Sequence, residues 1–106
     1  MEYEKGDRLL NTIPYEKRAM VYKNAIKMNG DIIQTGVAIE EMSELTKELC
    51  KLMFRGIDNM DHIAEEIADV TIMLEQLRIM YGLNDAVCEY MDAKVLRLND
   101  RLAFRE

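Results

Sequence analysis

The sequence predicts an all-α protein folded as an antiparallel four-helix bundle, and three observations carry this prediction. Apolar residues recur at intervals of three and four in four separate stretches, and no stretch alternates strictly as a half-buried strand would. Glycines stand where three of these stretches end. The connections are short, which makes antiparallel neighbours the default arrangement of the helices.

The first predicted helix begins at Pro14, whose fixed φ suits a first helical turn, and ends at Asn29 and Gly30. Its apolar stripe is Tyr15, Ala19, Tyr22 and Ile26. The second and longest helix begins near Asp31, a plausible N-cap, and ends at Gly56. Its apolar residues are Ile33, Val37, Met42, Leu45, Leu49 and Leu52.

The third predicted helix follows the turn-forming loop GIDNMD, with Asp61 as its N-cap, and stops before Gly82. Its apolar stripe is Ile63, Ile67, Val70, Leu74, Leu77 and Tyr81. The fourth helix begins near Asn84, and its predicted inward face is Cys88, Met91, Val95, Leu98 and Leu102. No linker interrupts the pattern, so residues 1–106 are expected to form one domain.

Composition narrows the possible partners. The 106 residues carry a formal net charge of -6, and this argues against a nucleic-acid partner, whose binding needs clustered lysines and arginines. A small anionic ligand bridged by metal remains compatible with the charge. We recognise no secretion signal and no apolar run long enough to span a membrane, and we expect a cytoplasmic protein without a membrane partner. Cys50 and Cys88 are expected to be buried, reduced thiols.

Two acidic motifs lie on consecutive predicted helices, EEMSE on the second and EEIAD on the third. At about 100° per residue, Glu41 and Glu44 lie about 60° apart on one helix face, and Glu66 and Asp69 do the same on the next helix. Because a short loop joins these helices, the two faces can confront each other. The remaining glutamates, at the edges of the faces, are Glu40 and Glu65.

This acidic cluster has two readings. Charge runs on helices are commonly solvated or paired with lysine and arginine. On the third helix, however, apolar stripes border the carboxylates on both sides, which indicates that they are recessed. Recessed carboxylates need a counter-charge, and oxygen ligands of this kind suit Mg²⁺ or Mn²⁺. A di-iron centre is disfavoured, because the single histidine, His62, precedes the acidic motif instead of lying within it.

The paired motifs, EEMSEL at 40–45 and EEIADV at 65–70, resemble those of the all-α nucleoside triphosphate pyrophosphohydrolases. This is the MazG-like group, related to the dimeric dUTPases and the phosphoribosyl-ATP pyrophosphatases. The resemblance extends from about Met20 to Leu102. It implies Mg²⁺-dependent hydrolysis of a nucleoside triphosphate between the α and β phosphates, which gives a monophosphate and pyrophosphate and could serve to cleanse the nucleotide pool.

Site residues follow from the same resemblance. It implies metal ligands at Glu41, Glu44, Glu66 and Asp69. Glu40 would orient a ligand or activate the attacking water. Late in the domain, the resemblance assigns a phosphate-binding role to a loose group of polar residues, Lys94, Asn99 and Arg101.

Gln34 lies two turns before Glu41 on the same face of the second helix, where it could contact the base or sugar. An exposed glutamine near a helix start is the equally weighted alternative.

The third helix is apolar around more than half of its circumference, so we expect at least a homodimer. The resemblance extends this to a homotetramer with sites shared between subunits. The alternative functions are a phosphoribosyl-ATP pyrophosphatase and a non-enzymatic helical interaction module.

Overall fold

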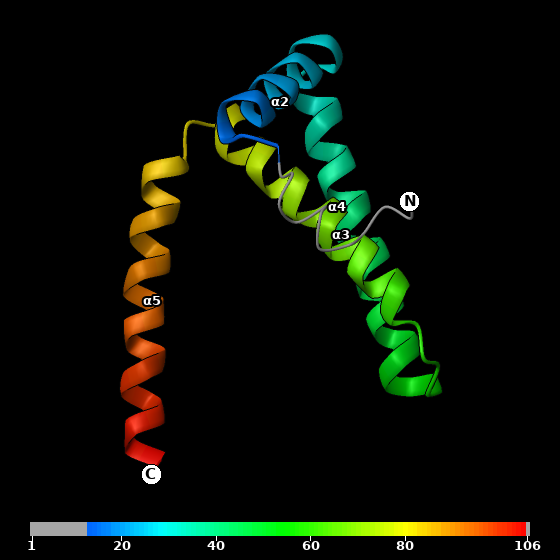
Figure 1. Cartoon of the computed structure of the whole chain (residues 1–106), viewed down its shortest axis with the longest axis vertical. Coiled ribbons are helices and arrows are strands. Elements are labelled where there is room, and N and C mark those ends of the chain that lie inside the picture. The colour runs from blue at the N-terminus through cyan, green and yellow to red at the C-terminus, as the bar shows by residue number, and fades with distance from the viewer. Residues whose placement is uncertain (1–12, 106) are drawn as a thin grey trace, which may run out of the picture.

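The structure, a computed structural model, describes residues 13–105, which form four α-helices and no strand (Figure 1). The helices are α2 (Tyr15–Asn29), α3 (Asp31–Arg55), α4 (Met60–Met80) and α5 (Asn84–Arg105). The all-α prediction is therefore confirmed for this part of the chain. No helix within it has both the length and the apolar character needed to cross a membrane.

Helices α3 and α4 form an antiparallel pair that makes up most of the folded body (Figure 1). Gly56 ends α3 with a φ of 63°, and the Ile57 N–H donates to the Lys51 carbonyl at 3.2 Å. The Asn59 side chain then donates to the Glu48 carbonyl at 3.0 Å and to Glu48 Oε1 at 2.6 Å. These bonds fix where α4 starts against the end of α3.

The predicted helix starts are shifted slightly. Gly30 and Asn59 occupy the N-cap positions of α3 and α4, and neither makes a side-chain capping bond. Asp31 and Asp61, predicted as caps, lie instead in the first turns of these helices. Their negative charges still stabilise the two helices, because the helix macrodipole is positive at the N-terminus.

The core is small and contains amide groups among its apolar residues. Its buried apolar side chains are Tyr22, Ala38, Ile63 and Met73. Between α3 and α4, Gln34 Nε2 donates to Gln76 Oε1 at 2.7 Å, and Gln34 Oε1 accepts from Asn29 Nδ2 at 2.9 Å. The chain of amides satisfies polar groups that would otherwise destabilise the interface.

Helix α5 extends away from the other three helices (Figure 1). At the link between α4 and α5, Gly82 has a φ of 62°. The Gly82 N–H donates to the Ile79 carbonyl and the Leu83 N–H donates to the Arg78 carbonyl. These two bonds form a Schellman motif, which ends α4. Beyond the link, α5 contacts α4 alone among the described elements, and none of its residues is buried. The face predicted to point inward is therefore exposed in the single chain.

Both cysteines are free and exposed. The prediction that Cys50 and Cys88 are buried is therefore wrong for the single chain. The reason is that α5 covers no other helix, which leaves Cys88 open, while Cys50 lies on a side of α3 that no described helix covers.

Candidate metal centre

The two acidic motifs meet across the α3–α4 interface. One carboxylate oxygen from each of Glu41, Glu66 and Asp69 lies within 4.8 Å of the other two. Glu41 comes from α3, whereas Glu66 and Asp69 are one turn apart on α4. All three side chains are partly buried. The expectation that these faces confront each other is confirmed, and the position of the three side chains between α3 and α4 accounts for their partial burial.

The cluster concentrates negative charge at a partly buried site. Loss of hydration raises the pKa of Glu66, and the neighbouring charges of Asp69, Glu41, Glu44 and Glu65 raise it further. Burial likewise raises the pKa of Glu41, followed by the charges of Asp69, Glu44 and Glu40. Both shifts have the same physical cause, since a carboxylate that is poorly hydrated and surrounded by others holds its proton more tightly.

One oxygen of the cluster has no partner. Glu66 Oε1 is buried and accepts no hydrogen bond from the described residues. The only ion pair within the described range is Lys51 to Glu48, at 3.0 Å, and it belongs to a different part of α3. The described residues therefore do not support the salt-bridged reading of the cluster. Three converging carboxylates with an unsatisfied oxygen are a donor set that fits a hard divalent cation.

The other acidic candidates lie around this cluster. Glu44, predicted as a fourth ligand, is exposed and is not one of the three converging groups, although its charge affects both Glu41 and Glu66. Glu40 and Glu65 are also exposed. The structure therefore brings together three of the four expected ligands.

Gln34 is buried, with 5% of its surface exposed. The alternative of an exposed glutamine is therefore wrong. Both ends of its amide are engaged, by Asn29 on one side and Gln76 on the other. In this structure Gln34 joins α3 to α4, and its burial leaves little of its amide for a base or sugar to reach.

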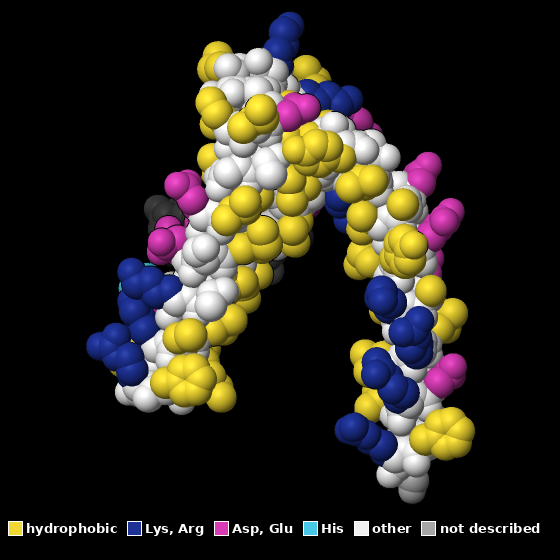
Figure 2. Space-filling view, turned by 180° about the vertical axis from the view of Figure 1, so that it is seen from behind, with side chains coloured by type: hydrophobic (Ala, Val, Ile, Leu, Met, Phe, Trp, Pro, Cys, Tyr) yellow, Lys and Arg dark blue, Asp and Glu magenta, His cyan; other side chains and the backbone are white. Residues whose placement is uncertain are grey.

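The predicted phosphate-binding group lies apart from the acidic cluster. Lys94, Asn99 and Arg101 are exposed on α5, beyond the link to α4. Figure 2 shows lysine and arginine side chains along this helix, separated from the body formed by the other helices. The structure therefore does not bring these three residues to the carboxylates of their own chain.

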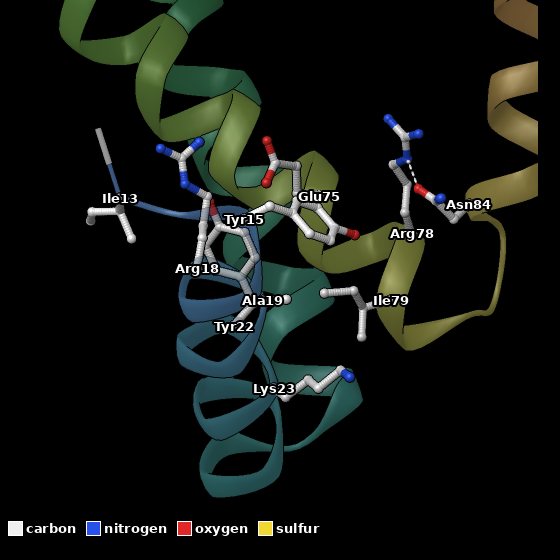
Figure 3. A pocket seen from close by; sticks show the side chains of 10 residues that line it. All are labelled: Ile13, Tyr15, Arg18, Ala19, Tyr22, Lys23, Glu75, Arg78, Ile79 and Asn84. Atoms are coloured by element: carbon white, nitrogen blue, oxygen red, sulfur yellow. Dashed lines mark hydrogen bonds between the residues drawn. The ribbon is translucent and has the colours of Figure 1, made fainter. Parts of the chain in front are cut away.

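No motif in the sequence marks a cavity of about 670 Å³ between α2 and α4 (Figure 3). The sequence gives little sign of this cavity, because its polar residues belong to three separate helices. On α2 they share a face with the apolar stripe, so periodicity alone assigns that face to the core.

The chain has no match among protein families, curated proteins or solved structures. Fold and site together define an all-α chain with a three-carboxylate candidate metal centre between two antiparallel helices.

Proposed function

We propose that this chain is a cytoplasmic, Mg²⁺-dependent nucleoside triphosphate pyrophosphohydrolase that releases a nucleoside monophosphate and pyrophosphate. The observation that carries the proposal is the convergence of Glu41, Glu66 and Asp69 around the unsatisfied Glu66 Oε1. The resemblance of EEMSEL and EEIADV to the MazG-like motifs supports the choice of substrate and of the bond that is broken. Cleansing of the nucleotide pool is the role that this activity would serve.

The three converging carboxylates would hold Mg²⁺, or Mn²⁺ in its place. Glu44 lies one turn from Glu41 and would complete the set by turning its exposed side chain inward. When bound, the cation supplies charge neutralisation for the triphosphate and lowers the pKa of water. All-carboxylate ligation leaves room for phosphate oxygens, because Mg²⁺ is commonly held by a few carboxylates together with its substrate.

The chain's own residues would position the nucleophile. Glu40 is exposed next to Glu41, where its carboxylate can orient a ligand or accept a proton from the attacking water. Attack by water at the α-phosphorus with pyrophosphate as the leaving group requires no covalent intermediate. The choice of the α-phosphorus over the γ-phosphorus depends on the family resemblance alone.

A second copy of the chain is part of this proposal. Exposed apolar side chains run along α5 and along the α3–α4 pair (Figure 2), and Met91, Val95, Leu98 and Leu102 form one stripe of α5. In a homodimer or homotetramer, α5 of one copy would cover the body of another and complete the four-helix, MazG-like arrangement. Its Lys94, Asn99 and Arg101 would then contact the phosphates held by the partner's carboxylates.

The test is a pyrophosphate-release screen over canonical, deoxy and damaged nucleoside triphosphates with Mg²⁺. For the best substrate, hydrolysis in ¹⁸O-labelled water should put the label on the monophosphate and leave the pyrophosphate unlabelled. Orthophosphate with a nucleoside diphosphate as the products would overturn the proposal even if metal binding were real.

Two alternatives are separated by the same screen. A phosphoribosyl-ATP pyrophosphatase would use the same carboxylates, and it would act on that intermediate while leaving all triphosphates intact. A non-enzymatic interaction module is favoured by one observation, the exposed apolar stripe of α5. Such a module would release no pyrophosphate from any nucleotide, and Mn²⁺ would not raise its melting temperature.

A further inference from the structure

The cavity between α2 and α4 has the size of a small-molecule site. Its volume of about 670 Å³ lies inside the range of roughly 300–1,000 Å³ that is typical of ligand pockets. An adjoining hollow of about 570 Å³ shares Arg18, Tyr22 and Glu75 with it and continues along α4 past Ile72. Because they share these residues, the two hollows form one groove, which the described residues leave open to solvent.

This groove is separate from the candidate metal centre. At about 100° per residue, Glu75 points roughly 180° away from Glu66 around the axis of α4. Glu66 faces α3, whereas Glu75 and Arg78 line the cavity together with residues of α2 (Figure 3). Helix α4 therefore carries a carboxylate cluster on one side and a ligand-sized groove on the other.

The cavity is positively charged in a protein whose net charge is -6. Arg18, Lys23 and Arg78 line it with Glu75 as the only carboxylate. Within residues 13–105 none of these three cations lies within 4.0 Å of a carboxylate, because the sole such pair is Lys51 with Glu48. As far as the described residues go, the three cations can therefore meet an anionic ligand.

Arg78 is held in place at the edge of the cavity. Its Nε donates to Asn84 Oδ1 at 3.0 Å (Figure 3), and its Nη2 donates to Cys88 Sγ at 3.2 Å. These bonds use one side of the guanidinium and leave other N–H groups free. A fixed guanidinium loses little conformational entropy when it binds an anion.

Two tyrosines supply aromatic surface. Tyr15 is exposed at the start of α2, and Tyr22 is buried deeper in the groove. Burial raises the pKa of the Tyr22 phenol, and the nearby charge of Glu75 raises it further. A phenol is neutral at physiological pH and can donate a hydrogen bond, and the exposed Tyr15 ring offers a face for stacking.

We propose that this groove binds a small aromatic phosphate ester, of the size of a nucleoside monophosphate, without any metal. Arg18 and Lys23 contact the phosphate, Tyr15 stacks on the ring, and Glu75 accepts a hydrogen bond from a ring amino group. Arg18 favours a phosphate because its N–H groups match phosphate oxygens in pairs, and the fixed guanidinium of Arg78 adds positive charge at the edge of the cavity. This inference does not depend on the proposed hydrolase activity, because the groove and the carboxylate cluster share no residue.

The experiment titrates the full chain with mant-labelled AMP in EDTA and follows fluorescence anisotropy. The test variant is R18E/K23E, and the matched control is K17E/K27E, which makes the same charge change on the same helix outside the groove. We expect binding by the wild-type chain, a loss of affinity of at least about tenfold in R18E/K23E, and a change of less than about twofold in the control.

Three results would overturn the proposal. The first is no binding of the probe by the wild-type chain up to millimolar protein, which would leave the groove without a ligand of this class. Equal weakening in both double variants would show nonspecific attraction between charges. Loss of binding in E66Q would place the probe at the acidic cluster instead. If R18E/K23E does not fold, as judged by circular dichroism, the single variant K23E at an exposed position takes its place, with K27E as control.

Discussion

Helix α5 and the α3–α4 pair are similar in sequence pattern and different in environment. All three helices are long and amphipathic, with 25, 21 and 22 residues in α3, α4 and α5. The pair buries residues on both members, whereas α5 buries none. The difference shows that an apolar stripe on a helix does not by itself determine whether that face is covered within the single chain.

The same two regions also differ in the charge of their side chains. The α3–α4 pair carries the converging carboxylates of Glu41, Glu66 and Asp69. Helix α5 carries a basic stripe at intervals of three and four, visible in Figure 2, made up of Lys94, Arg97, Arg101 and Arg105. Under the proposed function, metal ligation belongs to the first region and phosphate contacts to the second, so each can be tested by disabling one region at a time.

The largest effect is expected from Glu66→Gln. The change removes a carboxylate from the centre of the cluster, and we expect Mg²⁺-dependent pyrophosphate release to fall by about 10³-fold. Glu65→Gln makes the same charge change at the exposed neighbouring position and should leave the rate within about threefold of the wild type. If both variants are folded by circular dichroism and lose activity equally, the loss cannot be assigned to the converging carboxylates, and the prediction is wrong.

The second prediction asks whether α5 serves another copy of the chain. Arg101→Ala should lower the rate by about 10- to 100-fold through loss of a phosphate contact. Mixing refolded E66Q and R101A chains should restore about a quarter of the wild-type rate, because half of a random set of dimers then has one intact composite site. E66Q mixed with E41Q should recover nothing, since both defects lie in the same region. No recovery with R101A would mean that α5 does not act across the interface.

A third prediction compares stability in the two regions. Met73 is 6% exposed in α4, and Met73→Ala should lower the free energy of unfolding by about 2–4 kcal/mol at any protein concentration. Leu98 is 49% exposed on α5, and Leu98→Ala should act mainly by shifting dimer dissociation, which makes its effect depend on concentration. Denaturant unfolding measured at several protein concentrations distinguishes these two effects. A large, concentration-independent loss for Leu98→Ala would indicate that α5 packs on its own chain.

Helix ends and the meeting of the acidic faces could be predicted because they depend on local chemistry. Gly56 and Gly82 adopt positive φ at the ends of helices, and the spacing within each motif fixes one face of its helix. The burial of Gln34 could not be predicted, since a polar residue carries no periodic signal and its partner, Gln76, is on another helix. The position of α5 could not be predicted either, since its apolar stripe does not identify the surface that would cover it.

The buried amide pair gives a smaller effect that tests the role of Gln34. Gln34→Leu leaves the Gln76 amide without its partner and should lower stability by about 1–3 kcal/mol. The double change Q34L/Q76L should regain part of this loss, because neither side then buries an unpaired amide. If Gln34 also contacts the substrate, KM should rise in both variants; an unchanged KM with lower stability would assign it to the fold alone.

The smallest effect is a dependence of metal-linked stability on pH. The folded chain without metal raises the pKa of Glu41 and Glu66 above the usual 4.5, so the folded state binds these protons more tightly than the unfolded state. The contribution of these groups to stability is therefore full below about pH 4.5 and falls as pH rises through the raised pKa values. A cation competes with the same protons. Mn²⁺ should accordingly raise the melting temperature by a few degrees more at about pH 7.5 than at about pH 5, and E41Q/E66Q should show neither trend. A metal-induced rise that is equal at both pH values would show that Mn²⁺ binds elsewhere.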